Sequence, residues 1–405
     1  MGYCATSFDE VGWNRRIPSL RTDALTLDVK PKTELPATSN NFDALRLGLA
    51  VLVIYSHSYA LGLGSEATEP LYRLTRGQMS LGALAVDLFF VLSGYLITAS
   101  AEKSSSVGSY LKKRVRRIYP AFIVNAILSV VIVVPLAHAV IASPAWGNFA
   151  LQTLRLCEFE YSSAFSANPF PGPINGSLWS IQYEFWCYLG VAALASFGLL
   201  RRKWLLLASF VASVGVSVLW QVKGIVLGGK FLGQLLGSPQ LWARMLPLYL
   251  AGVVAYLFRD RIRLNARGAV LALIVLIGAS FVSLGWTLVF PAAGTYLALY
   301  LAFAPWLRLH GAARLGDFSY GTYLYAFPIA QIIMSRFGHE VPPWQLFVLA
   351  TPLTLLAAIA SWYGVERWFV PRARRNEAVR SSAGAQAVAV TRSSARAVLE
   401  ARADS

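Results

Sequence analysis

The sequence predicts an all-α fold, a polytopic membrane helix bundle of about ten transmembrane helices with both termini in the cytoplasm. The first observation behind this class is the composition: of 405 residues, 56% are hydrophobic and 14% are charged, and the mean hydropathy is +0.53. Soluble domains usually carry about 25% charged residues. The other two observations are apolar runs of membrane-spanning length and an uneven distribution of Lys and Arg.

The apolar runs divide the chain into its expected helices. About 20 apolar residues are needed to cross roughly 30 Å of hydrocarbon. The runs near this length lie at about 43–63, 80–100, 118–141, 177–198, 204–221, 241–258, 268–285, 287–305, 317–335 and 345–366. The least certain boundary is at Ser283 to Thr287, where a glycine interrupts one long run. An odd number of spans would put the two termini on opposite sides.

The basic residues test this count. With a cytoplasmic N-terminus, fifteen Lys and Arg residues fall in the predicted cytoplasmic loops and six in the opposite loops. Cytoplasmic loops carry an excess of Lys and Arg, so the distribution supports ten spans. We expect residues 41–370 to form the membrane domain and residues 1–40 and 371–405 to be disordered cytoplasmic tails. No cleavable signal peptide is expected, because about 40 polar residues precede the first run.

Charge and cysteine usage narrow the class of partner. The net charge of +16 does not predict a nucleic-acid partner, because basic residues in a membrane chain usually sort into cytoplasmic loops. Cys4, Cys157 and Cys187 are too few and too scattered for a disulfide framework or a metal site. We therefore expect membrane lipids as partners and no bound metal.

Arg46 and His57 stand out in the first span, where "RLGLAVLVIYSH" places them eleven residues apart. This spacing is close to three helical turns, so both side chains share one face, about 16 Å apart along the axis. Asp43 lies on the same face and is expected to pair with Arg46 as structural support. Histidine is the side chain whose ordinary pKa suits proton transfer near neutrality. One stripe thus joins a cytoplasmic cation to a deeper base.

Further ionisable residues lie in the next three spans. Asp87 in span two and Glu184 in span four are expected at about the depth of His57, which predicts a site at that level. Arg114 and Arg117 form an R-x-x-R pair at the cytoplasmic mouth of span three, with Pro120 expected in the first turn of that helix. Two arginines at this spacing are suited to bind phosphates.

Each of these residues also has a structural interpretation. Arg46 is explained equally well as an anchor whose long side chain reaches the membrane surface. Arg114 and Arg117 are alternatively explained as ordinary basic residues that anchor a helix at the cytoplasmic surface. His57 and Asp87 are alternatively interpreted as residues that bond a neighbouring helix.

Five ordered motifs together resemble the acyltransferase 3 family of membrane acyltransferases. They are R-x10-H in span one, G-x4-D-L-F-F-V-L-S-G in span two, R-x-x-R-I-x-P at span three, S-L-W-S-x-x-x-E in span four and "FSYGTYLYAFP" in span nine. The resemblance covers about residues 43–366. It implies O-acylation, most often acetylation, of extracytoplasmic glycans such as lipopolysaccharide or exopolysaccharide. The acyl donor would be cytoplasmic acetyl-CoA, and the location the bacterial inner membrane.

Family roles carry over where the motifs match. The resemblance implies that His57 is the essential histidine, that Arg46 is the span-one arginine and that Glu184 is the span-four glutamate. Arg46, Arg114 and Arg117 would hold the anionic end of CoA. In span nine, many members have a histidine after the Y-L-Y element where this chain has "YAFP", so a role for that histidine cannot be assumed here.

The expected chemistry assigns His57 as the base that takes a proton from a sugar hydroxyl. Glu184 or Asp87 would orient the imidazole or stabilise its cation. The candidates for the oxyanion donor are Ser93, Trp179 and Ser180. The sequence leaves open whether the acyl group passes first to histidine.

Two other classes of function compete with acyl transfer. Intramembrane Arg, His, Asp and Glu also mark transporters of sugars or anions, although the inverted repeats frequent in transporters are not found. A polysaccharide-assembly or lipid-interaction protein without catalysis is the second alternative. Consumption of acetyl-CoA by the purified protein separates these classes. The oligomeric state and the acceptor sugar are not predicted.

Overall fold

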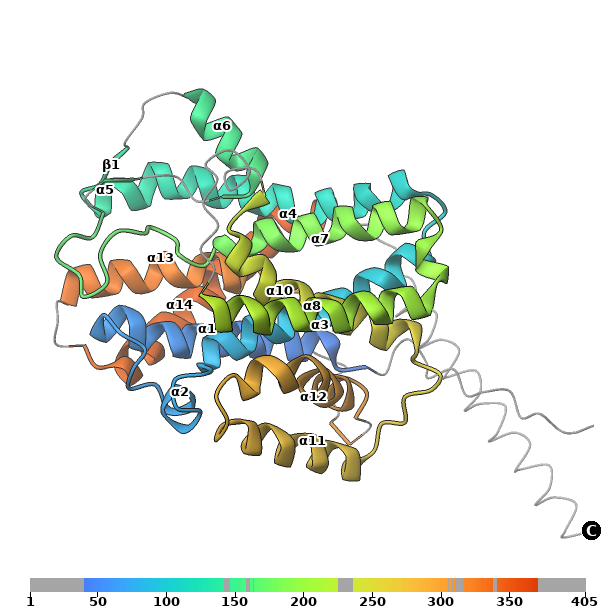
Figure 1. Cartoon of the computed structure of the whole chain (residues 1–405). Helices are drawn as coiled ribbons and strands as arrows, with labels where there is room; N and C mark the ends of the chain where they lie inside the picture. Colours follow the sequence, from blue (N-terminus) through green and yellow to red (C-terminus); the bar gives the residue numbers. More distant parts are fainter. Residues whose placement is uncertain are drawn as a thin grey trace, which may run out of the picture. The chain divides into compact units, whose positions relative to one another are not determined.

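The computed structural model describes residues 40–370, except 142–145, 158–160, 163, 225–235, 305, 308, 310–315 and 338–340 (Figure 1). The predicted tails 1–40 and 371–405 lie outside the described residues, apart from Asn40. The described part is almost entirely helical. Two strands of two residues each, β1 (Val140–Ile141) and β2 (Tyr161–Ser162), pair antiparallel.

Each predicted span overlaps a helix. In chain order these helices are α1 (Phe42–Leu63), α3 (Leu81–Glu102), α4 (Val107–Leu128), α7 (Trp179–Ser196), α8 (Lys203–Lys223), α10 (Pro239–Leu257), α11 (Ala266–Ala279), α12 (Gly285–Ala302), α13 (Ser319–Phe337) and α14 (Pro343–Ser361). The short helix α5 (Val134–Leu136) falls within predicted span three. The sequence analysis did not predict the other short elements, which are α2 (Pro70–Leu74), α6 (Trp146–Arg155), the 3₁₀ turn η2 (Leu199–Arg201) and α15 (Arg367–Phe369).

Six of the described helical stretches are long and apolar enough to cross a membrane. They are 42–63, 81–102, 107–136, 203–223, 285–302 and 343–369. Helix α11, with 14 residues, is apolar but short. The chain is therefore a multi-pass membrane protein. The count of ten crossings and the cytoplasmic placement of both termini stay predictions.

The helix ends follow local sequence signals. Ser80 and Ser106 cap α3 and α4, because each side-chain oxygen accepts a hydrogen bond from a backbone N–H in the first turn. The predicted break at Ser283 to Thr287 is confirmed, since α11 ends at Ala279 and α12 begins at Gly285. Leu284 between them has a positive φ of 60°, which turns the chain.

Span three differs from its expected boundaries. The helix begins at Val107 rather than near residue 118, and Pro120 lies inside α4 instead of in its first turn. The apolar run alone misplaced the start, because the preceding basic residues continue the same helix. After α4 the chain passes through a π-helical turn, η1 (Ser129–Val133), into α5. Arg114 and Arg117 therefore lie within the helix.

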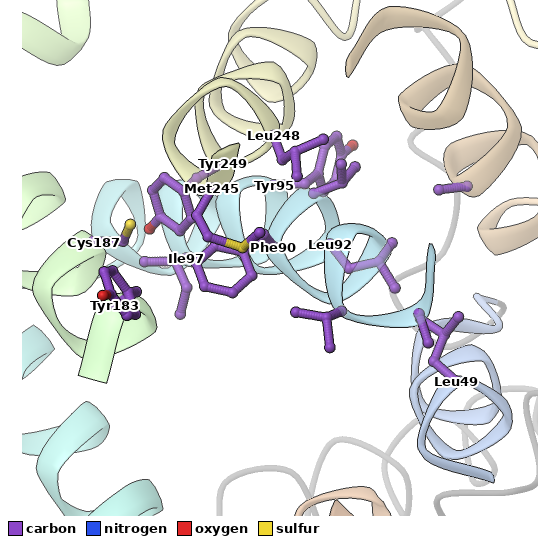
Figure 2. Packing of buried hydrophobic residues seen from close by; sticks show 14 of the residues in the cluster. Leu49, Phe90, Leu92, Tyr95, Ile97, Tyr183, Cys187, Met245, Leu248 and Tyr249 are labelled. Atoms are coloured by element: carbon purple, nitrogen blue, oxygen red, sulfur yellow. The ribbon is translucent and has the colours of Figure 1, made fainter. Parts of the chain in front are cut away.

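Helix α3 contributes much of the main hydrophobic core. Figure 2 shows Phe90 and Ile97 of α3 beside Met245 and Tyr249 of α10. The two helices cross closely at glycines: a Cβ at Gly94 would overlap the backbone oxygen of Tyr249. Close backbone approach at small residues is the usual way in which helices associate in a membrane. This crossing fixes α3 for the site described below.

Contacts at both ends of α1 fix its direction relative to α3. At the start of α1, Phe42 stacks on Tyr95 of α3, with ring centroids 5.7 Å apart, whereas Ser56 faces Gly82 at the start of α3. Helices α1 and α3 are therefore antiparallel. Successive membrane spans must alternate in this way, so the arrangement agrees with the predicted order of spans one and two.

Candidate functional site

Helix α1 carries both residues of the R-x10-H motif on one unbroken helix. Helix α13 packs along it in the same direction. Arg46 meets Asp317, two residues before α13 begins, and His57 meets Phe327 farther along α13. The predicted single face of Arg46 and His57 is confirmed, because both contact this one neighbour.

Two arginines and two carboxylates form an ionic cluster at the Arg46 end. Asp317 Oδ2 accepts hydrogen bonds from Arg46 Nη1 at 3.1 Å and from Arg117 Nη2 at 2.6 Å. Arg117 Nη1 donates to Glu366 Oε2 at 3.1 Å. The side chains of Asp317 and Glu366 are only 8% and 2% exposed. Carboxylates buried to this degree require partners, which these arginines supply.

Hydroxyl groups complete the hydrogen bonding of these carboxylates. Ser319 Oγ donates to Asp317 Oδ1 at 2.6 Å, and Ser361 Oγ donates to Glu366 Oε1 at 3.0 Å. Glu366 ends a π-helical turn, η5 (Trp362–Glu366), that continues α14. The sequence analysis did not single out Asp317 or Glu366. The feature of the sequence that could have identified them is that each is an acidic residue at the edge of a predicted span.

The expected partner of Arg46 is different in the structure. Its ion pair is with Asp317, 271 positions along the chain, rather than with Asp43. Asp43 adds negative charge near Arg46 without being that partner. Local helical spacing suggested Asp43, but helix packing brings a better-placed acid to the guanidinium.

Arg114 differs from Arg117 although both belong to the R-x-x-R motif. Arg114 Nη2 donates to Ser100 Oγ at 3.2 Å, and its guanidinium lies 5.9 Å from the ring centroids of Tyr110 and of Tyr188. Its Nε is buried without a hydrogen-bond partner. In the described part of the chain no carboxylate pairs with Arg114. The two arginines therefore face different neighbours.

His57 lies in apolar surroundings at the other end of this face. The imidazole makes an edge-on contact with the Phe327 ring, with centroids 5.3 Å apart. Its Nδ1 is buried without a hydrogen-bond partner. The residue as a whole is half-buried. Of the two ring nitrogens, only Nδ1 is both buried and without a hydrogen-bond partner.

Glu184 is bonded to hydroxyl groups instead of to the imidazole. Its Oε1 accepts hydrogen bonds from Ser93 Oγ at 2.8 Å and from Tyr188 Oη at 2.6 Å. Ser93 is two residues from Tyr95, and Tyr95 stacks on Phe42, the first residue of α1. His57 is next to Ser56, which faces Gly82 at the opposite end of α3. Glu184 therefore lies toward the Arg46 end. The expectation that Glu184 and His57 share one depth is wrong.

Asp87 has a partner that the sequence analysis did not name. Arg244 of α10 donates from both Nη2, at 2.8 Å, and Nε, at 3.1 Å, to Asp87 Oδ1. Arg244 Nη2 also donates to the backbone oxygen of Ala83 at 3.3 Å. No hydrogen bond joins Asp87 or Glu184 to His57 within the described residues. The expected pair of a base and an orienting acid is not assembled here.

The three oxyanion candidates are not equivalent. Tyr323 Oη donates its one proton to the backbone oxygen of Ser177 at 2.7 Å. In the 2.6 Å hydrogen bond between Ser180 Oγ and Tyr323 Oη, Ser180 is therefore the donor. Ser93 likewise donates to Glu184. Trp179 packs edge-on against Tyr183. Its indole N–H has no hydrogen-bond partner in the described part of the chain. Trp179 is therefore the candidate whose donor is free.

The departure in span nine places Ala326 directly after the Y-L-Y element. Ala326 is 2% exposed and packs in a small hydrophobic cluster with Ile54 and Phe327. An apolar contact thus occupies the position where many family members have histidine. Among the described residues no group of three or more His, Cys, Asp or Glu side chains is arranged to hold a metal ion.

Comparisons with known proteins bear on the chemistry. The acyltransferase domain family matches residues 39–363. An O-acetyl transferase of Shigella phage Sf6 is 28% identical over 341 residues, which cover 82% of this chain and 97% of that protein. Nodulation protein 10 of Rhizobium leguminosarum bv. viciae is 26% identical over 354 residues, 81% of this chain and 92% of that protein. Acyltransferase MdmB of Streptomyces mycarofaciens is 27% identical over 288 residues, which cover 66% of this chain and 72% of that protein. No solved structure matches.

Proposed function

Since the chain belongs to the acyltransferase 3 family, we propose that it moves an acetyl group from cytoplasmic acetyl-CoA to a hydroxyl of an extracytoplasmic polysaccharide or glycolipid. That it is a membrane acyltransferase follows from the family and from its long apolar helices. The name of the phage relative, O-acetyl transferase, supports acetyl as the group transferred. This chemistry requires a membrane between the cytoplasmic donor and the acceptor, and the bacterial inner membrane is the proposed location.

The observation that carries the proposal is the arrangement along α1. One end of the helix lies in a cluster of arginines, and the other carries a half-buried histidine in apolar surroundings. An anionic nucleotide suits the first environment, and a neutral sugar hydroxyl suits the second. The two ends are about 16 Å apart, a distance that an extended pantetheine arm would bridge.

Arg114 is the residue best suited to bind the phosphates of CoA. Arg46 and Arg117 already share the charges of Asp317 and Glu366, so a phosphate must compete for them. Arg114 has no such competitor among the described residues and retains guanidinium N–H groups for a ligand. A guanidinium offers five N–H donors in a planar fork that matches phosphate oxygens. Arg46 and Arg117 would add positive potential and hold the helices that surround the donor.

His57 would act as the general base. The sugar oxygen attacks the thioester carbonyl carbon while Nε2 takes the hydroxyl proton. A C–O bond forms and the C–S bond breaks. The imidazolium then returns the proton to the CoA thiolate, which leaves the acetylated sugar and free CoA. The free indole N–H of Trp179 is the proposed donor to the oxyanion.

The deciding experiment is acetyl-CoA consumption by the purified protein in detergent, with and without candidate glycans. We expect consumption that depends on an added glycan and on His57, with acetyl recovered as a sugar ester. Transport is the competing function. It would show no consumption, but uptake of a labelled sugar into vesicles that contain the protein. That second result would overturn the proposal.

A further inference from the structure

The segment 164–178, which leads from β2 to α7, is fixed to α13 by buried amides. Gln331 of α13 is fully buried, and its Nε2 donates to the backbone oxygens of Phe170, at 2.8 Å, and of Pro173, at 3.3 Å. Asn168 Nδ2 donates back to Gln331 Oε1, at 2.7 Å, and to the Gln331 backbone oxygen, at 2.9 Å. Gln331 thus joins three residues of the segment to one helix.

The same segment makes a further contact with α13 and one with the end of α1. Asn175, which is 1% exposed, donates to the backbone oxygen of Leu324 at 2.7 Å. Gly64 closes α1 with a φ of 72°, and a Cβ there would lie 2.7 Å from the backbone oxygen of Pro169. Glycine is therefore required at this contact by both conformation and space. The segment is anchored on the two helices that position His57 and Phe327.

Aromatic contacts connect this segment to the imidazole. The Phe170 ring lies 6.4 Å from the Phe327 ring, and the Phe327 ring lies 5.3 Å from the imidazole, both edge-on. Phe327 is 4% exposed and Gly176 lies directly under its ring. Phe170 is only partly buried. Of these rings, Phe170 is the one that can offer a face to a ligand close to His57.

We propose that the segment 164–178 is the acceptor-binding wall beside His57, that Phe170 packs against the sugar ring and that Gln331 is a positioning residue for this wall. This proposal rests on the proposed function and names where its acceptor binds. The ligand class is a neutral hexose ring with a free hydroxyl. Apolar and aromatic walls with a few fixed polar groups are typical of small-ligand sites.

The charge distribution separates this wall from the donor site. The segment 164–178 contains no charged residue. It therefore has nothing to bind the phosphates of CoA, whereas the C–H face of a sugar packs well on an aromatic ring. The buried amides hold the wall rigid before the acceptor arrives, which lowers the ordering cost of binding.

The experiment measures transfer by Phe170→Ala, Phe170→Trp and Gln331→Met, with oligosaccharides released by mild acid from the surface glycan of the producing cell. At saturating acetyl-CoA, Phe170→Ala should raise the acceptor KM about tenfold, while the KM for acetyl-CoA stays within about twofold. Phe170→Trp should restore most of the acceptor affinity. Gln331→Met should raise the acceptor KM while keeping the side-chain volume.

Asn125→Leu is the matched control, because Asn125 is a buried amide of α4 whose Nδ2 has no partner. It should leave both KM values unchanged. An unchanged acceptor KM in Phe170→Ala, or equal losses for donor and acceptor, would overturn the acceptor wall while leaving acyl transfer standing. Elution and melting temperature of each variant check its folding.

A binding readout keeps this test independent of turnover. A cysteine at the exposed Ala167 should react more slowly with a thiol reagent when the same oligosaccharides are present. A cysteine at the exposed Val282 in the α11–α12 turn should not. Protection at 167 without turnover would support the wall and contradict the proposed function. No protection at 167 would overturn the wall.

Discussion

At one end of α1, Arg46 and Arg117 share Asp317, and Arg117 also pairs with Glu366. At the other end His57 is held by ring packing, and its Nδ1 has no partner. Removing one partner of a buried ion pair is strongly destabilising, so the ionic end stabilises the fold. The histidine end leaves a titratable group uncommitted. The difference teaches that many polar contacts mark a stabilised region, whereas a reactive group is recognised by the contacts it lacks.

The largest expected difference between these two ends of α1 is the side of the membrane on which their loops lie. We expect a cysteine introduced at Ser105 or Asp260, on exposed loops near the ionic end, to resist an impermeant thiol reagent in intact cells. A cysteine at the exposed Ser166 should react completely. The native cysteines would be replaced first. Labelling of Asp260→Cys from outside would contradict the ten-span arrangement.

Removing the base should have the next largest effect. His57→Gln keeps much of the size and hydrogen bonding but not the basicity, so transfer should fall by about 10²–10⁴-fold while acetyl-CoA still binds. Steady-state turnover and donor titration measure the two effects separately. His138→Asn, at an exposed position with positive φ that asparagine tolerates, is the control. Wild-type turnover in His57→Gln would make His57 a packing residue.

Breaking the ionic cluster should appear as lost stability. Arg117→Ala leaves Asp317 and Glu366 with less counter-charge, so the free energy of unfolding should fall by about 3–5 kcal/mol. Thermal unfolding in detergent measures this, with the exposed neighbour Arg116→Ala as the control. The sequence analysis instead assigned Arg117 to binding of the anionic end of CoA, a role in which its removal need not weaken the fold. A variant as stable as wild type would restore that interpretation.

Arg114→Ala should instead weaken acetyl-CoA binding by about 1.5–3 kcal/mol with the fold retained, because its charge has no carboxylate partner among the described residues. Arg114→Lys should recover part of the affinity, since lysine keeps the charge but loses the planar fork. Lys112→Ala, at an exposed position on the same helix, is the control in the donor titration. Unchanged affinity in Arg114→Ala would remove it from the donor site.

The smallest effect is expected from pH. Only neutral imidazole accepts a proton, so kcat should fall several-fold as the medium becomes acidic while donor affinity changes little. Measuring turnover and donor binding at the same series of pH values separates the two ends. Parallel losses in both would assign the pH dependence to donor binding instead of to His57.

Sequence reasoning was strongest where a property is carried by neighbouring residues. Apolar runs identified the helices, and the spacing of Arg46 and His57 fixed their common face on α1. The start of α4 was missed, because hydropathy reports where a helix is apolar and not where it begins. The R-x-x-R motif was recognised, but the sequence did not show that its two arginines have different partners.

The sequence by itself determined the class of protein, its family and the residue types available for catalysis. Tertiary structure alone decided which of those residues are free to act. Asp317 and Arg117 are 200 positions apart, and Asp87 and Arg244 are 157 apart. No local pattern encodes such pairs, because helix packing brings them together. In a medium of low polarity that packing determines which charges are neutralised and which remain for a substrate.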